Sequence, residues 1–403
     1  MPATRSKAEL DQIAVANFCT YLKIPSVHPN VDYTECIAFI KDQAAQIGLE
    51  YRLFEFVKNK PIIVLTWEGK NPKLPSILLN SHMDVVPVYP ELWNHDPFGA
   101  EIDAQGNIYA RGSQDMKCVG IQYLETIRRL KESGEKLERT IHLSFVPDEE
   151  IGGFDGMKIF VHTQEFRSLN VGFALDEGMS SADPFFLIYY AERTVVQIEF
   201  TIPGTEGHGS LLLRDTAGEK LRRLLDFVMQ FRQTQVDKLE SNPDILIGDV
   251  TTANLTMIKG GVEPNVIPPE LFVTVDFRVA IDFDLKKFEE QVRSWAAQAG
   301  QGITLRFVQK NNLVKPTMLD ETNPYWMAMK KQLDDMKATY KKAVFPGATD
   351  SRYCREVGIP VVGFSPINST PVLLHANDEF LNKGVFLKGI DIYMKIIPAI
   401  ANV

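Results

Sequence analysis

Short apolar runs that alternate with helix-like segments are the feature that most constrains the fold of this 403-residue chain. Between two of these runs lies "VGIQYLETIRRLKESGE", in which Val119, Tyr123, Ile127 and Leu130 fall on one face of a helix. Strands that alternate with helices predict an α/β domain. The runs that read as strands are "SILLN" (76–80), "TIHLSFV" (140–146) and "NVGFAL" (170–175).

From about residue 193 the expected order of elements changes. The segments up to about residue 311 read as strand, helix, strand, strand, helix and strand. This βαββαβ order is the ferredoxin-like split unit, which closes on itself as a compact domain. We therefore expect an α/β fold made of residues 1–190 and 312–403, with a smaller domain inserted at residues 191–311.

The charge balance excludes some classes of partner. The formal net charge is −9 and the pI is about 5.4, so no basic field attracts nucleic acid or an anionic membrane. The four cysteines are widely spaced and form no CxxC pair, which argues against a disulfide framework. The first twenty residues contain charges instead of a long apolar run, and no segment suits a membrane span. We expect a cytoplasmic protein.

Acids or histidines follow several of the predicted strands. Ligand sites in open α/β sheets lie beyond the carboxyl ends of the strands, so these side chains are expected to meet. Close carboxylates repel one another, and burying them requires a cation or a proton between them. Imidazole and carboxylate suit zinc or a related divalent metal. The residues concerned are His82, Asp84, Asp115, Asp148, Glu149, Glu150, Asp176, Glu177 and His375.

Each of these residues also has a simpler interpretation. An acid after a strand often caps a turn, and Asp176 is open to that interpretation. A single histidine in an apolar segment usually has a structural role. We assign such a role to His28, His95, His142 and His162.

Five phrases, in order along the chain, carry a resemblance to a known family. They are "LLNSHMDVVPV", "RGSQDMK", "VPDEEIGG", "FALDEG" and "LLHANDE". The chain resembles the aminoacylase-1 family, within the wider family of co-catalytic zinc amidohydrolases and peptidases. This resemblance implies a zinc-binding α/β domain and an inserted dimerisation, or lid, domain, and hence a homodimer. It also implies two zinc ions in each subunit.

The same resemblance implies a role for each acid and histidine. Asp115 bridges the two zinc ions; His82 and Glu177 complete the ligands of one, Glu150 and His375 those of the other. Asp84 is expected to accept the second imidazole N–H of His82 and fix its tautomer. Glu149 is the general base, with Gly152 and Gly153 letting the backbone turn sharply behind it.

The inserted segment adds candidates that the resemblance singles out. His208 in "GTEGHGS" is expected to reach the active site of the partner subunit and stabilise the oxyanion. Asn265 and Arg278 are expected to contact the substrate, although Arg278 alone reads as a surface arginine. Arg352 in "ATDSRY" is a candidate for binding the substrate carboxylate, because a guanidinium matches that group with two hydrogen bonds.

The implied activity is hydrolysis of N-acyl-L-amino acids to a carboxylate and a free L-amino acid. Two alternatives stay open. One is a metallo-dipeptidase or carboxypeptidase on the same scaffold, which would need an acidic partner for a free α-amine instead of an apolar acyl pocket. The other is a non-catalytic dimeric binding protein, which predicts an incomplete set of ligands.

Overall fold

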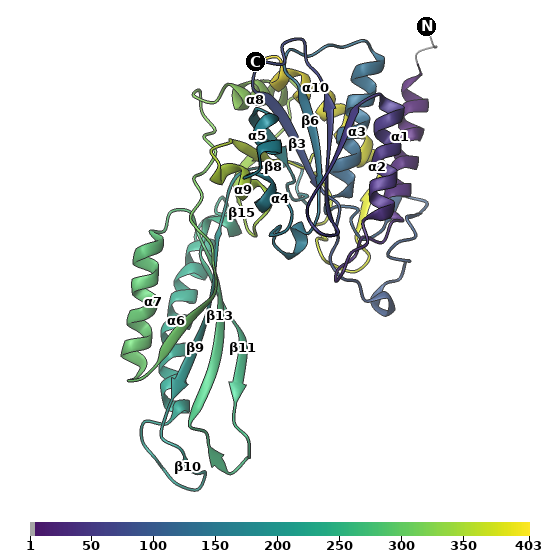
Figure 1. Cartoon of the computed structure of the whole chain (residues 1–403). Helices are drawn as coiled ribbons and strands as arrows, with labels where there is room; N and C mark the ends of the chain where they lie inside the picture. The colour runs from purple at the N-terminus through teal and green to yellow at the C-terminus, as the bar shows by residue number, and fades with distance from the viewer. Residues whose placement is uncertain (1–4) are drawn as a thin grey trace. The chain divides into compact units, whose positions relative to one another are not determined.

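A computed structural model describes residues 5–403 (Figure 1). The chain contacts divide it into two units. Unit 1 contains the described residues up to Tyr190, together with Thr317–Lys342 and Thr349–Val403; unit 2 contains Ala191–Pro316 and Ala343–Ala348. Residues 343–348 belong to unit 2 because the Pro346 carbonyl accepts two hydrogen bonds from the Arg193 guanidinium. The sequence places both these six residues and residues 312–316 in the first domain, whereas the chain contacts place them in unit 2.

An eight-stranded sheet forms the centre of unit 1. Its four middle strands, β6, β3, β7 and β16, are parallel to one another, whereas β1 and β2 pair antiparallel at one end. In spatial order the strands are β1 (Glu50–Val57), β2 (Lys60–Trp67), β6 (Ile141–Val146), β3 (Ser76–His82), β7 (Val171–Asp176), β16 (Val361–Gly363), β8 (Phe186–Glu192) and β15 (Tyr340–Phe345).

Helices cover both faces of this sheet (Figure 1). Successive side chains of a strand point to opposite faces, so Ile77 and Leu79 pack into one apolar core and Leu78 into the other. The first core contains α1 (Lys7–Leu22), α2 (Thr34–Ile47), α3 (Lys117–Glu132), α8 (Pro324–Asp335) and α10 (Lys383–Ala401). The second contains α4 (Met157–Phe160), α5 (Gln164–Ser168) and α9 (Ser351–Glu356).

Shorter elements complete unit 1. A three-stranded sheet consists of β4 (Glu101–Ile102), β5 (Asn107–Tyr109) and β17 (Phe380–Asn382). Two 3₁₀ turns, η1 (Pro90–Leu92) and η2 (Glu149–Ile151), lie in loops. The second of these turns begins directly after β6 and carries two of the predicted site residues.

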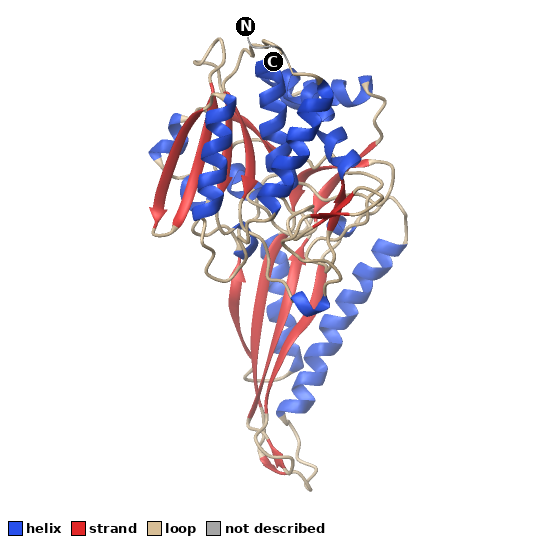
Figure 2. Cartoon of the chain, turned by 90° about the vertical axis from the view of Figure 1, so that its right-hand side faces the viewer, coloured by secondary structure: helices blue, strands red, loops and turns tan. Residues whose placement is uncertain are grey.

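Unit 2 is a four-stranded antiparallel sheet with two helices packed against it. The elements follow one another as β9, α6, β11, β13, α7 and β14, which confirms the predicted βαββαβ order. The sheet order is β11 (Thr252–Gly260), β13 (Glu270–Val279), β9 (Thr194–Pro203) and β14 (Thr304–Lys310), and its long strands stand out in red in Figure 2. The helices are α6 (Ala217–Glu240) and α7 (Leu285–Ala299).

Local sequence explains where the helices of both units begin. Ser6 and Thr216 each form a capping box with a glutamate three residues later, at the start of α1 and α6. Asp284 caps α7 through two backbone N–H groups. None of the described helices is long and apolar enough to cross a membrane.

Candidate metal centre

The predicted ligands gather at the carboxyl ends of the middle strands of unit 1. His82 is the last residue of β3, Glu150 lies in η2 just after β6, and Glu177 follows β7. These three strands are adjacent and parallel, so their carboxyl ends lie at the same edge of the sheet. Asp115 precedes α3, and His375 lies in the loop before β17.

Asp115 lies between the two histidines. Its Oδ1 is 3.1 Å from Nε2 of His82, and its Oδ2 is 3.3 Å from Nε2 of His375. A carboxylate whose two oxygens face two different imidazoles has the geometry of a bridging ligand. The histidines therefore mark two neighbouring positions for a cation.

Each histidine has a second carboxylate partner. Nε2 of His82 lies 3.7 Å from Oε2 of Glu177 and 4.0 Å from Oε2 of Glu149. Nε2 of His375 lies 3.1 Å from Oε2 of Glu150. His375 differs from the others in exposure: 56% of its side chain is accessible, against at most 9% for the side chains of His82, Asp115, Glu149, Glu150 and Glu177.

Burial, and after it the neighbouring carboxylates, raises the pKa values of the three glutamates of the site. Burial and the neighbouring Asp115 raise the pKa of Glu150 to about 7. Burial and the Glu177 carboxylate raise the pKa of Glu149 well above its usual value. Burial alone would lower the pKa of His82, but the Glu177 carboxylate and the hydrogen bond to Asp115 raise it well above the usual range. The cluster thus carries more negative charge than its two imidazoles balance.

This donor set fits a divalent metal. Buried Oε1 of Glu150 has no hydrogen-bond partner among the described residues, which leaves an oxygen free to coordinate. Two sets of three residues place ligand atoms within 4.8 Å of one another: His82, Glu149 and Glu177, and His82, Asp115 and Glu150. Mixed imidazole and carboxylate ligands are those that zinc and related metals take in hydrolytic sites.

Asp84 contacts different groups from those expected. Nδ1 of His82 lies 2.9 Å from the main-chain oxygen of Asp84, and 3.8 Å from its carboxylate. The expected hydrogen bond from His82 to the carboxylate is therefore corrected to the carbonyl of the same residue. The carboxylate instead accepts from the backbone N–H groups of Glu149 and Glu150, at 3.2 and 3.0 Å. It caps the 3₁₀ turn that carries both glutamates.

The turn after β6 has a left-handed backbone at three of its six residues. Asp148, Gly152 and Gly153 have φ of 61°, 106° and 62°. A Cβ at Gly153 would lie 2.5 Å from Oδ1 of Asp350, so only glycine fits there. The two glycines make the sharp turn that the sequence indicates.

Arg352 and Tyr353 hold the far end of this turn. The Arg352 guanidinium and the Tyr353 hydroxyl both donate to the Gly152 carbonyl, at 2.7 and 2.5 Å. Arg352 is 8% exposed. Its guanidinium is thus in contact with the loop that carries Glu149. The predicted role of Arg352 in substrate binding did not include this contact.

Three residues that the sequence did not single out for the site contact its acids from behind. His28, assigned a structural role, lies 2.9 Å from Oδ2 of Asp84. The Tyr33 hydroxyl donates to Asp148 at 2.8 Å, and Nζ of Lys60 lies 2.6 Å from the same carboxylate. Lys60 therefore neutralises the first of the three consecutive acids. No local sequence pattern marks these residues, because each lies 56 to 115 positions from its partner along the chain.

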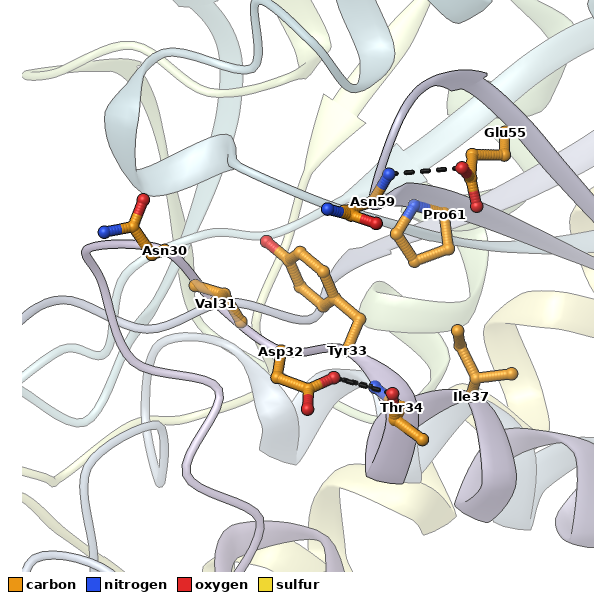
Figure 3. A pocket seen from close by; sticks show the side chains of 9 residues that line it. All are labelled: Asn30, Val31, Asp32, Tyr33, Thr34, Ile37, Glu55, Asn59 and Pro61. Atoms are coloured by element: carbon orange, nitrogen blue, oxygen red, sulfur yellow. Dashed lines mark hydrogen bonds between the residues drawn. The ribbon is translucent and has the colours of Figure 1, made fainter.

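A pocket of about 400 Å³ lies on the outer side of Tyr33 (Figure 3). Tyr33 forms part of its lining, together with residues from the start of α2 and the β1–β2 hairpin. None of the predicted metal ligands lines it. The pocket is separate from the metal centre, and Tyr33 connects its lining to Asp148, the acid that precedes Glu149 and Glu150.

The remaining predicted residues lie in unit 2. His208 belongs to β10 (Gly207–His208), which pairs with β12 (Val266–Ile267), and the Asn265 carbonyl accepts a hydrogen bond from the amide of Gly209. The structure thus brings His208 and Asn265 into one small ribbon. Arg278 lies next to the last residue of β13, and its guanidinium donates two hydrogen bonds to the Asp276 carboxylate.

Comparison with known proteins identifies relatives along nearly the whole chain. Residues 78–399 match the model of Peptidase family M20/M25/M40. Aminoacylase-1 of Pongo abelii is 49% identical over 400 residues, covering 99% of this chain and 98% of that protein. Aminoacylase-1 of Dictyostelium discoideum is 42% identical and covers 96% and 97%.

Solved structures share the fold at lower identity. An M20 family metallo-carboxypeptidase from Sulfolobus solfataricus has a TM-score of 0.73 at 18% identity, covering 96% of this chain and 99% of that one. Human carnosine dipeptidase 1 has a TM-score of 0.69 at 14% identity, covering 98% of each chain. Both proteins share the fold of this chain despite their low sequence identity to it.

Proposed function

We propose that this chain, which belongs to Peptidase family M20/M25/M40 and within it to the aminoacylase-1 proteins, hydrolyses the amide bond of N-acyl-L-amino acids. The products are a carboxylate and a free L-amino acid. The observation that carries the proposal is the placement of Asp115 between His82 and His375, with Glu149 beside them. The full-length identity to aminoacylase-1 proteins supports the substrate class.

Two zinc ions in each subunit are the proposed cofactors. His82, Asp115 and Glu177 would hold one ion, and Asp115, Glu150 and His375 the other. Zinc in such a site supplies a Lewis acid for the amide carbonyl and lowers the pKa of a bound water to roughly 7.

Glu149 is the proposed general base and acid. Its carboxylate accepts a proton from the attacking water and returns that proton to the leaving nitrogen of the amide. Burial and the neighbouring Glu177 carboxylate raise the pKa of Glu149 above its usual value, which favours uptake of a proton by this carboxylate. The Asp84 carboxylate accepts a hydrogen bond from the backbone N–H of Glu149 and so fixes the backbone that carries the base.

Residues of unit 2 complete the proposed site in a homodimer. His208 of a partner subunit would donate a hydrogen bond to the oxyanion, and Asn265 and Arg278 would contact the substrate. Arg352 would bind the substrate carboxylate.

We further propose that the enzyme works in the cytoplasm, which its four free cysteines support, since thiols persist in reducing compartments.

Hydrolysis of a matched substrate set tests the proposal. Purified protein would be assayed with N-acetyl-methionine, a long-chain N-acyl-glutamine and a simple dipeptide, before and after removal of metal with a chelator. We expect cleavage of the acylated amino acids, loss of activity in the chelator and recovery with zinc. If only the dipeptide is cleaved, the protein is a dipeptidase. If the zinc-loaded protein cleaves nothing, the result favours a non-catalytic binding protein.

A further inference from the structure

Three buried polar side chains outside the proposed chemistry join the loops that carry the metal ligands. They are Arg111, Gln114 and Glu379, each at most 2% exposed. Arg111 and Gln114 lie in the "RGSQDMK" segment with Asp115, and Glu379 lies four residues after His375. Two loops that are about 260 residues apart in sequence thus meet behind the bridging carboxylate.

Glu379 holds the loop that ends at Asp115. Its Oε1 accepts from the backbone N–H groups of Gln114 and Asp115, at 2.6 and 3.3 Å. Its Oε2 accepts from the amide of Gly112 at 3.2 Å and from Arg111 at 2.7 Å. The carboxylate therefore fixes the backbone from which the Asp115 side chain projects.

Arg111 extends the contact to the other loop. Its second guanidinium nitrogen donates to the carbonyl of His375 at 3.2 Å. The ion pair with Glu379 is buried, and such pairs contribute little net stability because desolvation offsets the attraction. What the pair does provide is a fixed path from the backbone of Asp115 to that of His375.

Gln114 uses its whole side-chain amide as a three-way link. Its Nε2 donates to the carbonyls of Pro371 and Phe380, at 3.0 and 2.9 Å, on either side of His375. Its Oε1 accepts from the amide of Leu373 at 3.0 Å and from the Ser180 hydroxyl at 3.1 Å. Two donors and two acceptor sites are all that a glutamine offers, so every one of them is used. Ser180 lies three residues after Glu177, so the link reaches that ligand's loop as well.

His375 depends on these contacts more than the other ligands do. It lies on a loop with a left-handed backbone, at φ of 61°, and more than half of its side chain is exposed. His82, by contrast, ends a fully buried strand. Strand packing fixes His82, whereas side-chain hydrogen bonds fix the loop of His375.

We propose that Gln114 and Glu379 are positioning residues that hold His375 against Asp115 and thereby set the affinity of the metal position formed by Asp115, Glu150 and His375. The proposal rests on the two-metal site described above. It predicts that the two metal positions respond differently to the loss of these contacts. The position at His82, Asp115 and Glu177 should lose less affinity, because His82 ends β3 and Glu177 directly follows β7, and it shares only the bridging Asp115 with the other position.

Zinc titration of the metal-free, full-length protein against a chromogenic chelator tests this proposal. Gln114→Glu replaces both N–H donors with an oxygen, and Glu379→Gln keeps the shape but removes the charge. We expect each variant to bind one of two ions 10- to 100-fold more weakly, the usual effect of losing an outer contact of a metal ligand. The second ion should lose clearly less affinity than the first, because it shares only Asp115 with the loosened position.

Asp378→Asn is the matched control, because Asp378 lies in the same loop and bonds instead to Asn94 and the amide of His95. Its two affinities should stay unchanged. Thermal unfolding of the metal-free variants shows whether the fold is kept, and Glu379→Gln carries the test if Gln114→Glu does not fold.

Three results would overturn the proposal, and they differ in what they say of the two-metal site. Variants that bind both ions like the wild type, or that weaken both ions equally, would remove the positioning role and leave the two-metal site in place. A wild-type chain that binds fewer than two ions would remove both proposals together.

Discussion

The central sheets of the two units are built on different patterns. In unit 1, β3 and β6 are buried at every residue, because helices cover both faces of the sheet. In unit 2, β9 and β13 alternate between buried and half-buried residues, since helices pack on one face only. Continuous apolar strands suit the first arrangement and alternation suits the second.

This difference separates stability from chemistry. Unit 2 is held by one apolar core, and the half-buried side chains of β9 and β13 lie on the face of the sheet away from its helices. Unit 1 has its polar groups at the strand ends, where buried carboxylates repel one another and side-chain hydrogen bonds replace apolar packing. Substitutions in the two sheets should therefore affect different measurements.

The largest effect is expected at the strand ends of unit 1. Glu149→Gln removes the proposed base and should lower kcat by about 10²- to 10⁴-fold. The unfolding temperature should not fall, because the change removes a buried carboxylate that its neighbours repel. Glu135→Gln, at an exposed glutamate of the same unit, is the control. A variant that loses its fold together with its activity would contradict the separation.

A core substitution in unit 2 should act in the opposite way. Phe277 is fully buried and packs edge-on against Phe288. Phe277→Ala should cost about 3–5 kcal/mol in the free energy of unfolding, by loss of apolar contact and the cavity left behind. Denaturant unfolding measures this cost. Thr274→Ala, on the other face of the same strand, should cost less than about 1 kcal/mol; equal costs would show that both faces are packed.

A buried histidine in the sheet of unit 1 predicts an effect of pH on stability. Burial lowers the pKa of His142 to about 4, and its ring nitrogens lie 2.9 Å from the Thr66 hydroxyl and 3.2 Å from the Leu169 carbonyl. Between pH 6.5 and 4 the unfolded chain takes up a proton at this histidine that the folded chain does not. Stability should fall as pH falls through this range, by roughly 3 kcal/mol in total.

Unfolding of His142→Gln at several pH values isolates this contribution. The variant should lose that part of the pH dependence, whereas the wild type keeps it. Equal slopes for the two proteins would show that His142 takes up its proton without unfolding.

The smallest effect is expected on the helix-free face of the unit 2 sheet. Glu199 on β9 pairs with Arg306 on β14 at 2.8 Å, and the arginine side chain is 67% exposed. Glu199→Ala should change the free energy of unfolding by less than about 1 kcal/mol, because exposed ion pairs contribute little. A cost above about 2 kcal/mol would show that this face is covered in solution.

The strand ends were the part of the site that the sequence could predict. His82, Glu150 and Glu177 each follow an apolar run, and adjacent parallel strands bring such positions together. The βαββαβ order of unit 2 could also be predicted from the sequence, since apolar and polar residues alternate along its strands and its helices have capping residues.

Contacts between distant side chains were not predictable in the same way. Gln114 bonds to residues 257 and 259 positions away, and neither periodicity nor spacing marks such a pair. The position of Arg352 on the Gly152 carbonyl depends on where α9 packs. The main-chain partner of His82 also depends on the local backbone, which residue types alone do not specify.

The place of β16 in the sheet has a consequence for how the protein is made. This strand lies between β7 and β8, but it comes from residues 361–363, long after both neighbours. On the ribosome, the nascent chain must extend past unit 2 before the gap beside β7 closes. An open parallel strand edge invites pairing with other chains. Ribosome-bound chains stalled before residue 360 are expected to bind chaperones, and release past this point should end that binding.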